Sequence, residues 1–302
     1  MANLPARVRI VDVGPRDGLQ NEKAVVPTDV KVALIEALAD AGIPSIEATS
    51  FVSPKWVPQM ADAADVMARI SRRRGVVYAV LTPNMKGFEG ALAAKADEVV
   101  VFGAASEAFS QKNINCSIAE SIERFAPVAR AAREAGMKVR GAISCCLGCP
   151  YQGEVKPEAV GYVARLMHGI GVQHIGVADT IGVGTPAATQ RALEAALAVY
   201  PIDEVSGHFH DTYGMALANV YASLEMGIAT FDASVAGLGG CPYAKGATGN
   251  VATEDVVYLL QGLGIETGID LAKLRAAGRM ISQHLGRTTS SRVAQALDAK
   301  AA

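Results

Sequence analysis

The chain has 302 residues, of which 50% are hydrophobic and 19% are charged, so it can bury a large core and is not typical of a disordered protein. Its 28 Lys and Arg residues nearly balance 30 Asp and Glu residues, and the net charge of -2 argues against nucleic acid or an anionic membrane as a partner. No apolar run of about 18 residues is present to span a bilayer. The N-terminal residues lack an apolar signal core, which together with five cysteines predicts a cytoplasmic protein with free thiols.

Short β-branched segments alternate with longer amphipathic ones along the chain. Strands are expected at 8–13, 45–48, 76–80, 98–102, 139–144, 174–178, 205–210 and 231–236. Helices are expected at 28–41, 57–72, 86–95, 117–135, 157–170, 186–199, 213–227 and 253–263. Eight strand–helix units in about 250 residues predict an α/β fold of the (β/α)8 TIM-barrel type rather than a doubly wound sheet.

The residues that flank the helical segments agree with this pattern. Ser117 and Glu120 have the spacing of a capping box. Four glycines follow helical segments, where a left-handed C-cap favours this residue: Gly42, Gly136, Gly171 and Gly227. No linker or low-complexity segment divides the chain. We therefore expect one catalytic domain over 1–302, with a barrel at about 8–264 and a helical extension at about 265–302.

Two histidines stand at the end of the seventh predicted strand. His208 and His210 are two residues apart, so both side chains point to the same face of a strand. Barrel enzymes have their active sites at the carboxyl ends of the strands. A pair of hydrogen-bonded core histidines is the alternative, but this position favours two metal ligands.

The first predicted strand leads into a turn with a cation and a carboxylate side by side. Gly14 and Pro15 direct Arg16 and Asp17 over the barrel mouth. Asp17 is a candidate third metal ligand, and Arg16 is a candidate for holding negative charge on a substrate or transition state. A surface salt bridge is the alternative for either residue.

Two more carboxylates follow strands at the same mouth. Glu47 ends the second predicted strand, and Asp179 ends the sixth. Both are candidate catalytic residues, although a buried carboxylate at such a position can also be the structural partner of an arginine such as Arg140.

A glycine-rich segment at 234–250 follows the eighth predicted strand and suits a loop that closes over substrate. Cys241 lies on this loop as a candidate acid or proton shuttle, and Asn250 is a candidate neutral oxygen ligand. Two His, one Asp and one Asn suit Mg²⁺ or Mn²⁺, with Co²⁺ and Zn²⁺ as alternatives. The remaining cysteines, including the C-x-x-C pair at 146 and 149, are interpreted as packing residues.

Such a metal beside an arginine and several carboxylates is typical of carbon–carbon bond chemistry. The metal polarises a hydroxyl or carbonyl group, a base removes a proton, and the cation stabilises an enolate. A Schiff-base aldolase would need a lysine at a strand end, and none of the predicted strands ends in one.

Three segments resemble the hydroxymethylglutaryl-CoA lyase family. They are VGPRDGLQNE at 13–22, TSFVSPKWVP at 49–58 and SVAGLGGCPY at 234–243, and the last is close to the signature of that family. The resemblance extends over about 8–296 and includes 102–107 and 112–117.

The resemblance implies a metal-dependent retro-Claisen cleavage of 3-hydroxy-3-methylglutaryl-CoA to acetyl-CoA and acetoacetate, in leucine catabolism, by a homodimer. It implies four metal ligands: Asp17, His208, His210 and Asn250. Arg16 would bind substrate and stabilise the enolate of acetyl-CoA, and Cys241 would help to protonate it. His208 would also take part in proton transfer, while Glu47 and Asp179 would shape the site and its proton traffic.

Three alternatives stay open at this point. A related barrel of the isopropylmalate- or homocitrate-synthase kind runs the condensation direction, but usually carries additional C-terminal regions. A lyase for a bulkier 3-hydroxy-3-alkylglutaryl-CoA would differ only in the shape of its pocket. The third alternative is a non-catalytic acyl-CoA-binding barrel. Some family members have a cysteine near the C-terminus that forms an intersubunit disulfide, which is not expected here because no cysteine follows Cys241.

Overall fold

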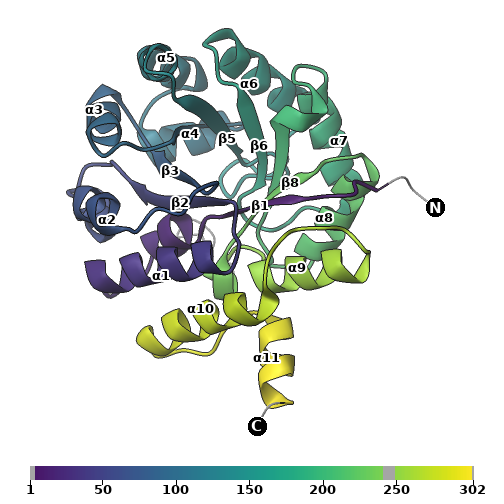
Figure 1. Ribbon diagram of the computed structural model, residues 1–302. Helices are drawn as coiled ribbons and strands as arrows, with labels where there is room; N and C mark the ends of the chain where they lie inside the picture. The colour runs from purple at the N-terminus through teal and green to yellow at the C-terminus, as the bar shows by residue number, and fades with distance from the viewer. Residues whose placement is uncertain (1–3, 241–248, 301–302) are drawn as a thin grey trace.

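Eight parallel strands close into a barrel in the order of the sequence, with the helices outside them (Figure 1). The computed structural model describes residues 4–240 and 249–300. The strands are β1 (Arg9–Asp12), β2 (Ser45–Ser50), β3 (Val77–Leu81), β4 (Glu98–Ala104), β5 (Lys138–Ser144), β6 (His174–Asp179), β7 (Val205–Phe209) and β8 (Thr230–Ala233). The parallel pairing of β1 with β8 closes the barrel, which confirms the predicted TIM-barrel fold.

The helices follow the strands and cover the outside of the barrel. They are α1 (Thr28–Asp40), α2 (Ala63–Arg69), α3 (Met85–Ala93), α4 (Glu107–Ile114), α5 (Ile118–Glu134), α6 (Pro157–Gly169), α7 (Pro186–Leu197), α8 (Ala216–Glu225), α9 (Thr253–Gly262), α10 (Leu271–His284) and α11 (Arg292–Ala299). The last two form the expected C-terminal extension. In Figure 1, α10 lies below α1 and α9, and it packs against both.

The segment 57–72 was expected to be a single helix, and this expectation is wrong. It contains a 3₁₀ turn at Pro58–Met60 and then the separate helix α2. Tertiary bonds hold the turn, because the Gln59 side chain accepts from the Val26 amide at 2.8 Å and the Gln59 carbonyl accepts from the buried Lys31 ammonium. These bonds outweigh the helical periodicity of the segment.

Two other boundaries differ from the predictions. Helix α4 was not expected, since its eight residues have weak amphipathic periodicity; Ser106 caps it by accepting from the Phe109 amide at 3.1 Å. Strand β2 continues to Ser50 after an irregularity in its pairing with β3, so Glu47 lies inside the strand and not at its end.

The predicted helix caps are confirmed. The Ser117 side chain accepts from the Glu120 amide at 3.2 Å, while the Glu120 carboxylate accepts from the Ser117 amide at 2.7 Å. Gly42 ends α1 with a φ of 91°, in the left-handed region that favours glycine. A Cβ atom there would lie 2.5 Å from the Gly268 carbonyl oxygen, so this glycine also permits close approach of the chain before α10.

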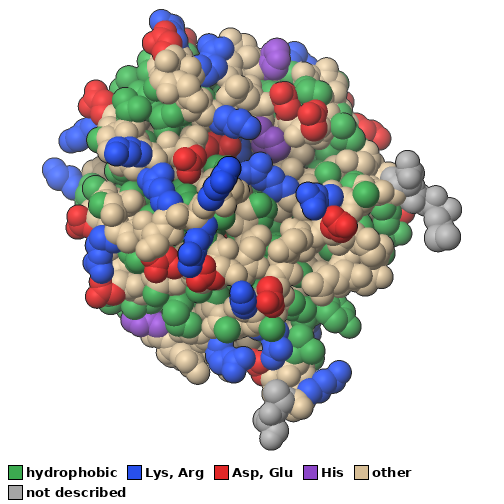
Figure 2. All heavy atoms as spheres, in the orientation of Figure 1, with side chains coloured by type: hydrophobic (Ala, Val, Ile, Leu, Met, Phe, Trp, Pro, Cys, Tyr) green, Lys and Arg blue, Asp and Glu red, His purple; other side chains and the backbone are tan. Residues whose placement is uncertain are grey.

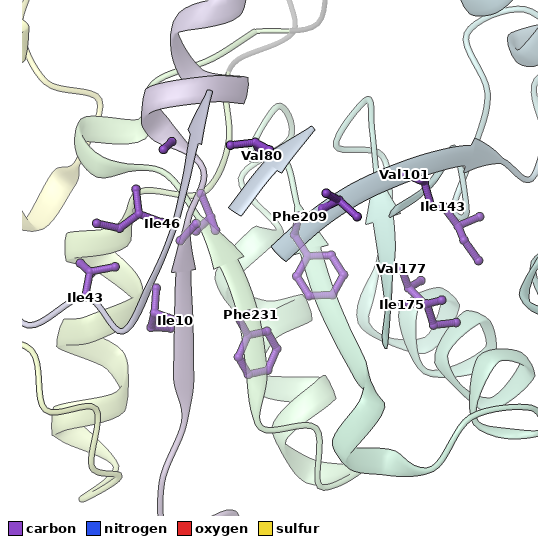
Figure 3. Packing of buried hydrophobic residues seen from close by; sticks show 14 of the residues in the cluster. Ile10, Ile43, Ile46, Val80, Val101, Ile143, Ile175, Val177, Phe209 and Phe231 are labelled. Carbon is purple, nitrogen blue, oxygen red and sulfur yellow. The ribbon is translucent and has the colours of Figure 1, made fainter. Parts of the chain in front are cut away.

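The main hydrophobic core lies between the barrel and its helices. Figure 3 shows side chains of this layer from several strands, including Ile46, Val177 and Phe209. Because side chains alternate along a strand, His208 points from the other face of β7, toward the barrel interior.

The barrel interior contains charged residues. Arg140 on β5 forms an ion pair with Asp232 on β8, and β6 and β7 stand between these strands in the barrel. The bond must therefore cross the interior. A barrel interior is more often filled by branched apolar residues, so this polar content marks the part of the fold that serves the site.

The outer surface has no strong charge bias on the face seen in Figure 2, where acidic and basic side chains are interspersed. Among the helices of residues 4–240 and 249–300, none combines the length and apolar character that a membrane span requires.

Candidate metal centre and active site

The structure brings three of the four predicted ligands into one group. Atoms of Asp17, His208 and His210 that could ligate a metal all lie within 4.8 Å of one another. Asp17 is held by the π-helical turn Gly14–Gly18 that follows β1. His208 is on β7, and His210 follows directly, with its ring centroid 5.3 Å from that of His208. The predicted histidine pair therefore faces the predicted aspartate.

Asn250, the fourth predicted ligand, lies beside this group. It pairs with His210 in an isolated antiparallel bridge, and its Nδ2 donates to Asp17 Oδ2 at 2.8 Å. Asn250 Oδ1 and His210 Nδ1 are both buried, and neither has a hydrogen-bond partner within 4–240 and 249–300. Buried polar atoms are normally satisfied. Two unpaired atoms within a set of nitrogen and oxygen ligands fit a divalent cation.

Arg16 connects this group to Glu47. Its Nε donates to Glu47 Oε1 at 2.6 Å, and its Nη1 donates to Asp17 Oδ1 at 2.8 Å. Burial lowers the pKa of Arg16, but the two carboxylates outweigh this effect and raise it. Burial alone would raise the pKa of Asp17, whereas Arg16 and then the two histidines hold it well below its usual range. Asp17 is therefore ionised and available to a cation.

His208 is held by a carboxylate that sequence patterns did not single out. Its Nδ1 lies 3.1 Å from Oδ2 of Asp232, which leaves Nε2 for the ligand group. The sequence signal for Asp232 is weak, since it is one acid in a short apolar strand. Arg140 pairs with Asp232, so the alternative that Glu47 is its hydrogen-bonded partner is not supported.

Asp179 lies near the same mouth but serves the backbone around it. Its carboxylate accepts from the amides of Val183 at 3.1 Å and Gly184 at 2.8 Å, and its carbonyl oxygen accepts from the His210 amide at 3.3 Å. Burial raises the pKa of Asp179, although the loop amides oppose this shift. These contacts place Asp179 where it shapes the loop after β6 and the backbone of His210.

Two further buried carboxylates support the beginning of the glycine-rich segment. Asp12 accepts from the Val235 amide at 3.0 Å and from Thr253 Oγ1 at 2.7 Å. Glu254 accepts from the Ala236 amide with both oxygens, and Ala236 has a φ of 57°, in the left-handed region. Burial raises the pKa of Asp12 to about 7 and that of Glu254 to about 8. Sequence patterns did not identify this bracing role.

Cys241 and the rest of the segment 241–248 lie outside the described residues, so the candidate acid has no observed position. The four cysteines that are described are buried, as expected for packing residues: Cys116, Cys145, Cys146 and Cys149.

A TIM barrel that gathers two imidazoles, a carboxylate, an amide and a buried arginine at its mouth defines a candidate metal-dependent barrel enzyme. The family model described as HMGL-like matches residues 7–281, and the chain belongs to this family.

Curated relatives and a solved structure agree with this assignment. The chain is 60% identical to the mitochondrial hydroxymethylglutaryl-CoA lyase of Rattus norvegicus over 296 residues, which cover 98% of this chain and 91% of the relative. It is also 60% identical to the 3-hydroxy-3-isohexenylglutaryl-CoA/hydroxymethylglutaryl-CoA lyase of Pseudomonas aeruginosa, with 99% and 100% covered. A crystal structure of hydroxymethylglutaryl-CoA lyase from Pseudomonas aeruginosa aligns with a TM-score of 0.96 at 60% identity, covering 99% of both chains.

Proposed function

We propose that this chain catalyses the metal-dependent cleavage of 3-hydroxy-3-methylglutaryl-CoA to acetyl-CoA and acetoacetate. The observation that carries the proposal is the unpaired Asn250 Oδ1 and His210 Nδ1 next to the Arg16–Asp17 pair. Together they offer a cation site directly beside a permanent positive charge. The names of the family relatives supply the substrate.

Asp17, His208, His210 and Asn250 would hold the divalent cation, with Mg²⁺ or Mn²⁺ favoured by the oxygen and imidazole ligands. When bound, the cation supplies Lewis-acid polarisation of substrate oxygens. The Asn250–Asp17 hydrogen bond and the Asp232–His208 contact orient two of these ligands from behind.

The reaction moves one proton from the tertiary hydroxyl of the substrate to the carbon next to its thioester. As the hydroxyl loses its proton, its oxygen becomes the ketone of acetoacetate, and the broken carbon–carbon bond leaves its electron pair on the acetyl-CoA enolate. Arg16, whose Nη1 and Nε are held by carboxylates, is placed to stabilise that negative charge. We assign protonation of the enolate to Cys241. His208 has Nδ1 on Asp232 and Nε2 toward the cation, so we assign it as a ligand, while Glu47 and Asp179 shape the site and its proton traffic.

A cavity next to the turn that holds Asp17 is suited to part of the acyl-CoA substrate. This cavity of about 430 Å³ is lined by Gly18, the residue after Asp17, and by Gly239 and Gly240 at the beginning of the glycine-rich loop. Lys23 and Arg287 also line it, and both are cations suited to phosphate groups. We propose that part of the CoA moiety lies in this cavity.

We further propose that the chain is a single catalytic domain, acts as a cytoplasmic homodimer and serves leucine catabolism. The near-neutral charge and the resemblance to hydroxymethylglutaryl-CoA lyases support these proposals. Light scattering on the purified protein tests the dimer, and a monomeric mass would overturn it.

The decisive test begins with protein stripped of metal by a chelator. Hydroxymethylglutaryl-CoA is added, Mg²⁺ or Mn²⁺ is titrated, and acetoacetate is measured. We expect no product without metal and a saturable rise with it. A parallel reaction with the isohexenyl analogue tests the second substrate in the name of the Pseudomonas aeruginosa relative. No acetoacetate with any metal would refute the proposed function, whereas turnover of the analogue alone would transfer it to the bulkier substrate.

A further inference from the structure

A chain of three polar side chains leads from the candidate metal group into the barrel interior. Asp232 Oδ2 lies 3.1 Å from His208 Nδ1, and its other oxygen accepts from Nη2 of Arg140. The side chains of Asp232 and Arg140 are each only 5% exposed. Arg140 lies in the third position of β5, deeper in the barrel than the mouth where the ligands gather.

The cost of burying Arg140 indicates that this residue serves more than stability. Its Nε and Nη1 are buried and have no hydrogen-bond partner among the residues that the structure describes. A buried ion pair can often be replaced by apolar residues without loss of stability, and unpaired donors add to its cost. What Arg140 does provide is a fixed positive charge against Asp232 at the centre of the barrel.

Arg140 fixes the orientation of Asp232. Its Nη2 donates to Oδ1 of Asp232, and Oδ2 is then directed at His208 Nδ1, 3.1 Å away. A carboxylate paired with a guanidinium acts as an acceptor, so Nδ1 of His208 donates the proton in their contact. The neutral ring then has its lone pair on Nε2, the nitrogen that Asp232 does not occupy.

We propose that Arg140 and Asp232 are positioning residues that fix the ring orientation and the Nδ1–H tautomer of His208, so that its Nε2 is ready for the metal. Neither residue touches the substrate. The proposal rests on the metal site proposed above and adds two residues from β5 and β8 to its support. Partners of this kind typically change metal affinity by about 10- to 100-fold.

The substitution Asp232→Asn tests the tautomer directly. In this variant Arg140 would still donate to the oxygen of the asparagine side chain, so the NH₂ group of that side chain would face His208 Nδ1. An NH₂ donor at Nδ1 favours the tautomer with its proton on Nε2. We expect Mn²⁺ affinity, measured without substrate from the free-Mn²⁺ electron paramagnetic resonance signal, to fall about 10- to 100-fold. The matched control is Asp255→Asn, since this buried carboxylate instead holds the beginning of α11 through Ser291 and Val293. Its Mn²⁺ affinity should match that of wild type.

Substitutions of Arg140 test whether this residue acts on His208 through Asp232. Arg140→Met removes the donor that orients Asp232, whereas Arg140→Lys keeps a cationic donor at this position. We expect Met to weaken Mn²⁺ binding more than Lys. Circular dichroism on each variant checks that the fold is retained. Equal Mn²⁺ affinity for folded Asp232→Asn and wild type would overturn the positioning role of Arg140 and Asp232 while leaving the metal site intact. No Mn²⁺ binding by wild type would overturn both the positioning role and the metal site.

The wild-type protein offers a measurement that needs no folded Asp232 variant. Long-range ¹H–¹⁵N correlation spectra of metal-free protein labelled at histidine report the tautomer of each ring, and His208→Gln identifies the relevant signals. We expect the Nδ1–H tautomer for the neutral ring of His208. A neutral ring with its proton on Nε2 would contradict the proposal, whatever the variants do.

Discussion

Replacing Arg16 by glutamine separates the two functions that its position combines. The guanidinium donates to Glu47 at 2.6 Å and to Asp17 at 2.8 Å, and both its charge and its shape are lost in Arg16→Gln. Losing one preorganised donor to a developing negative charge typically lowers kcat by about 100- to 1,000-fold. We therefore expect at least about a 100-fold loss of turnover at saturating metal.

The affinity for the metal, unlike turnover, should not fall in Arg16→Gln. Arg16 competes with a bound cation for the negative charge of Asp17, and the two histidines and Asn250 still lower the pKa of Asp17 when Arg16 is removed. Mn²⁺ affinity of the substrate-free protein should therefore be unchanged or tighter in Arg16→Gln. A combined loss of Mn²⁺ affinity and kcat would refute this reasoning and would make Arg16 an organiser of the metal site.

The substitution also has a stability cost that can be estimated. Glu47 is 2% exposed and would lose its charged partner, and breaking such a buried pair costs about 3–5 kcal/mol. An unfolding entropy of about 2.1 cal/mol/K per residue over 302 residues corresponds to about 0.6 kcal/mol per degree. The expected decrease in Tm is thus about 5–8 °C. The control Arg7→Gln breaks a pair with Glu266 whose side chains are 77% and 71% exposed, and should leave Tm and kcat unchanged.

Three other properties can be measured on single variants. His210→Ala should weaken Mn²⁺ binding by at least about 10-fold in the same resonance assay, whereas His168→Ala on α6 should not; equal affinities would remove His210 from the ligand set. Gly42→Ala should lower Tm more than Gly75→Ala, because both glycines have a left-handed φ but only the first would meet a carbonyl oxygen, at 2.5 Å. Burial raises the pKa of Glu254 from 4.5 to about 8, so the native state retains a proton that the unfolded chain has lost, and stability falls as pH rises across this window. The Tm of Glu254→Gln should therefore fall less than that of wild type between pH 5 and pH 8. Parallel curves of Tm against pH would contradict the raised pKa of Glu254.

The sequence was sufficient to predict the barrel because strand and helix periodicities alternate eight times. Alternation along a strand also placed His208 and His210 on one face, and the structure brings both to Asp17. The segment 57–72 was misjudged because Gln59 and Lys31 make tertiary bonds that periodicity does not contain.

Asp232 could not be identified in the same way, because its partner Arg140 is 92 residues away in the sequence. The two meet only after the barrel has closed, and a single acid in a short apolar strand has no local pattern that predicts its partner. Residues recognised by their place at a strand end were accessible to sequence reasoning, whereas residues defined by contacts across the interior were not.

The carboxylates around the barrel mouth form two groups. Those of the first contact charged side chains at the metal site, and those of the second hold the backbone around it. Asp17 and Asp232 face guanidinium and imidazole groups, which outweigh burial and lower their pKa values. Asp12, Asp179 and Glu254 instead accept from backbone amides, and burial raises their pKa values. An acid that stays ionised in the interior can bind a cation or orient a ligand, whereas the three acids of the second group hold backbone amides. By this criterion Asp179, although it ends β6 beside the site, acts mainly through the loop and the His210 backbone that it holds.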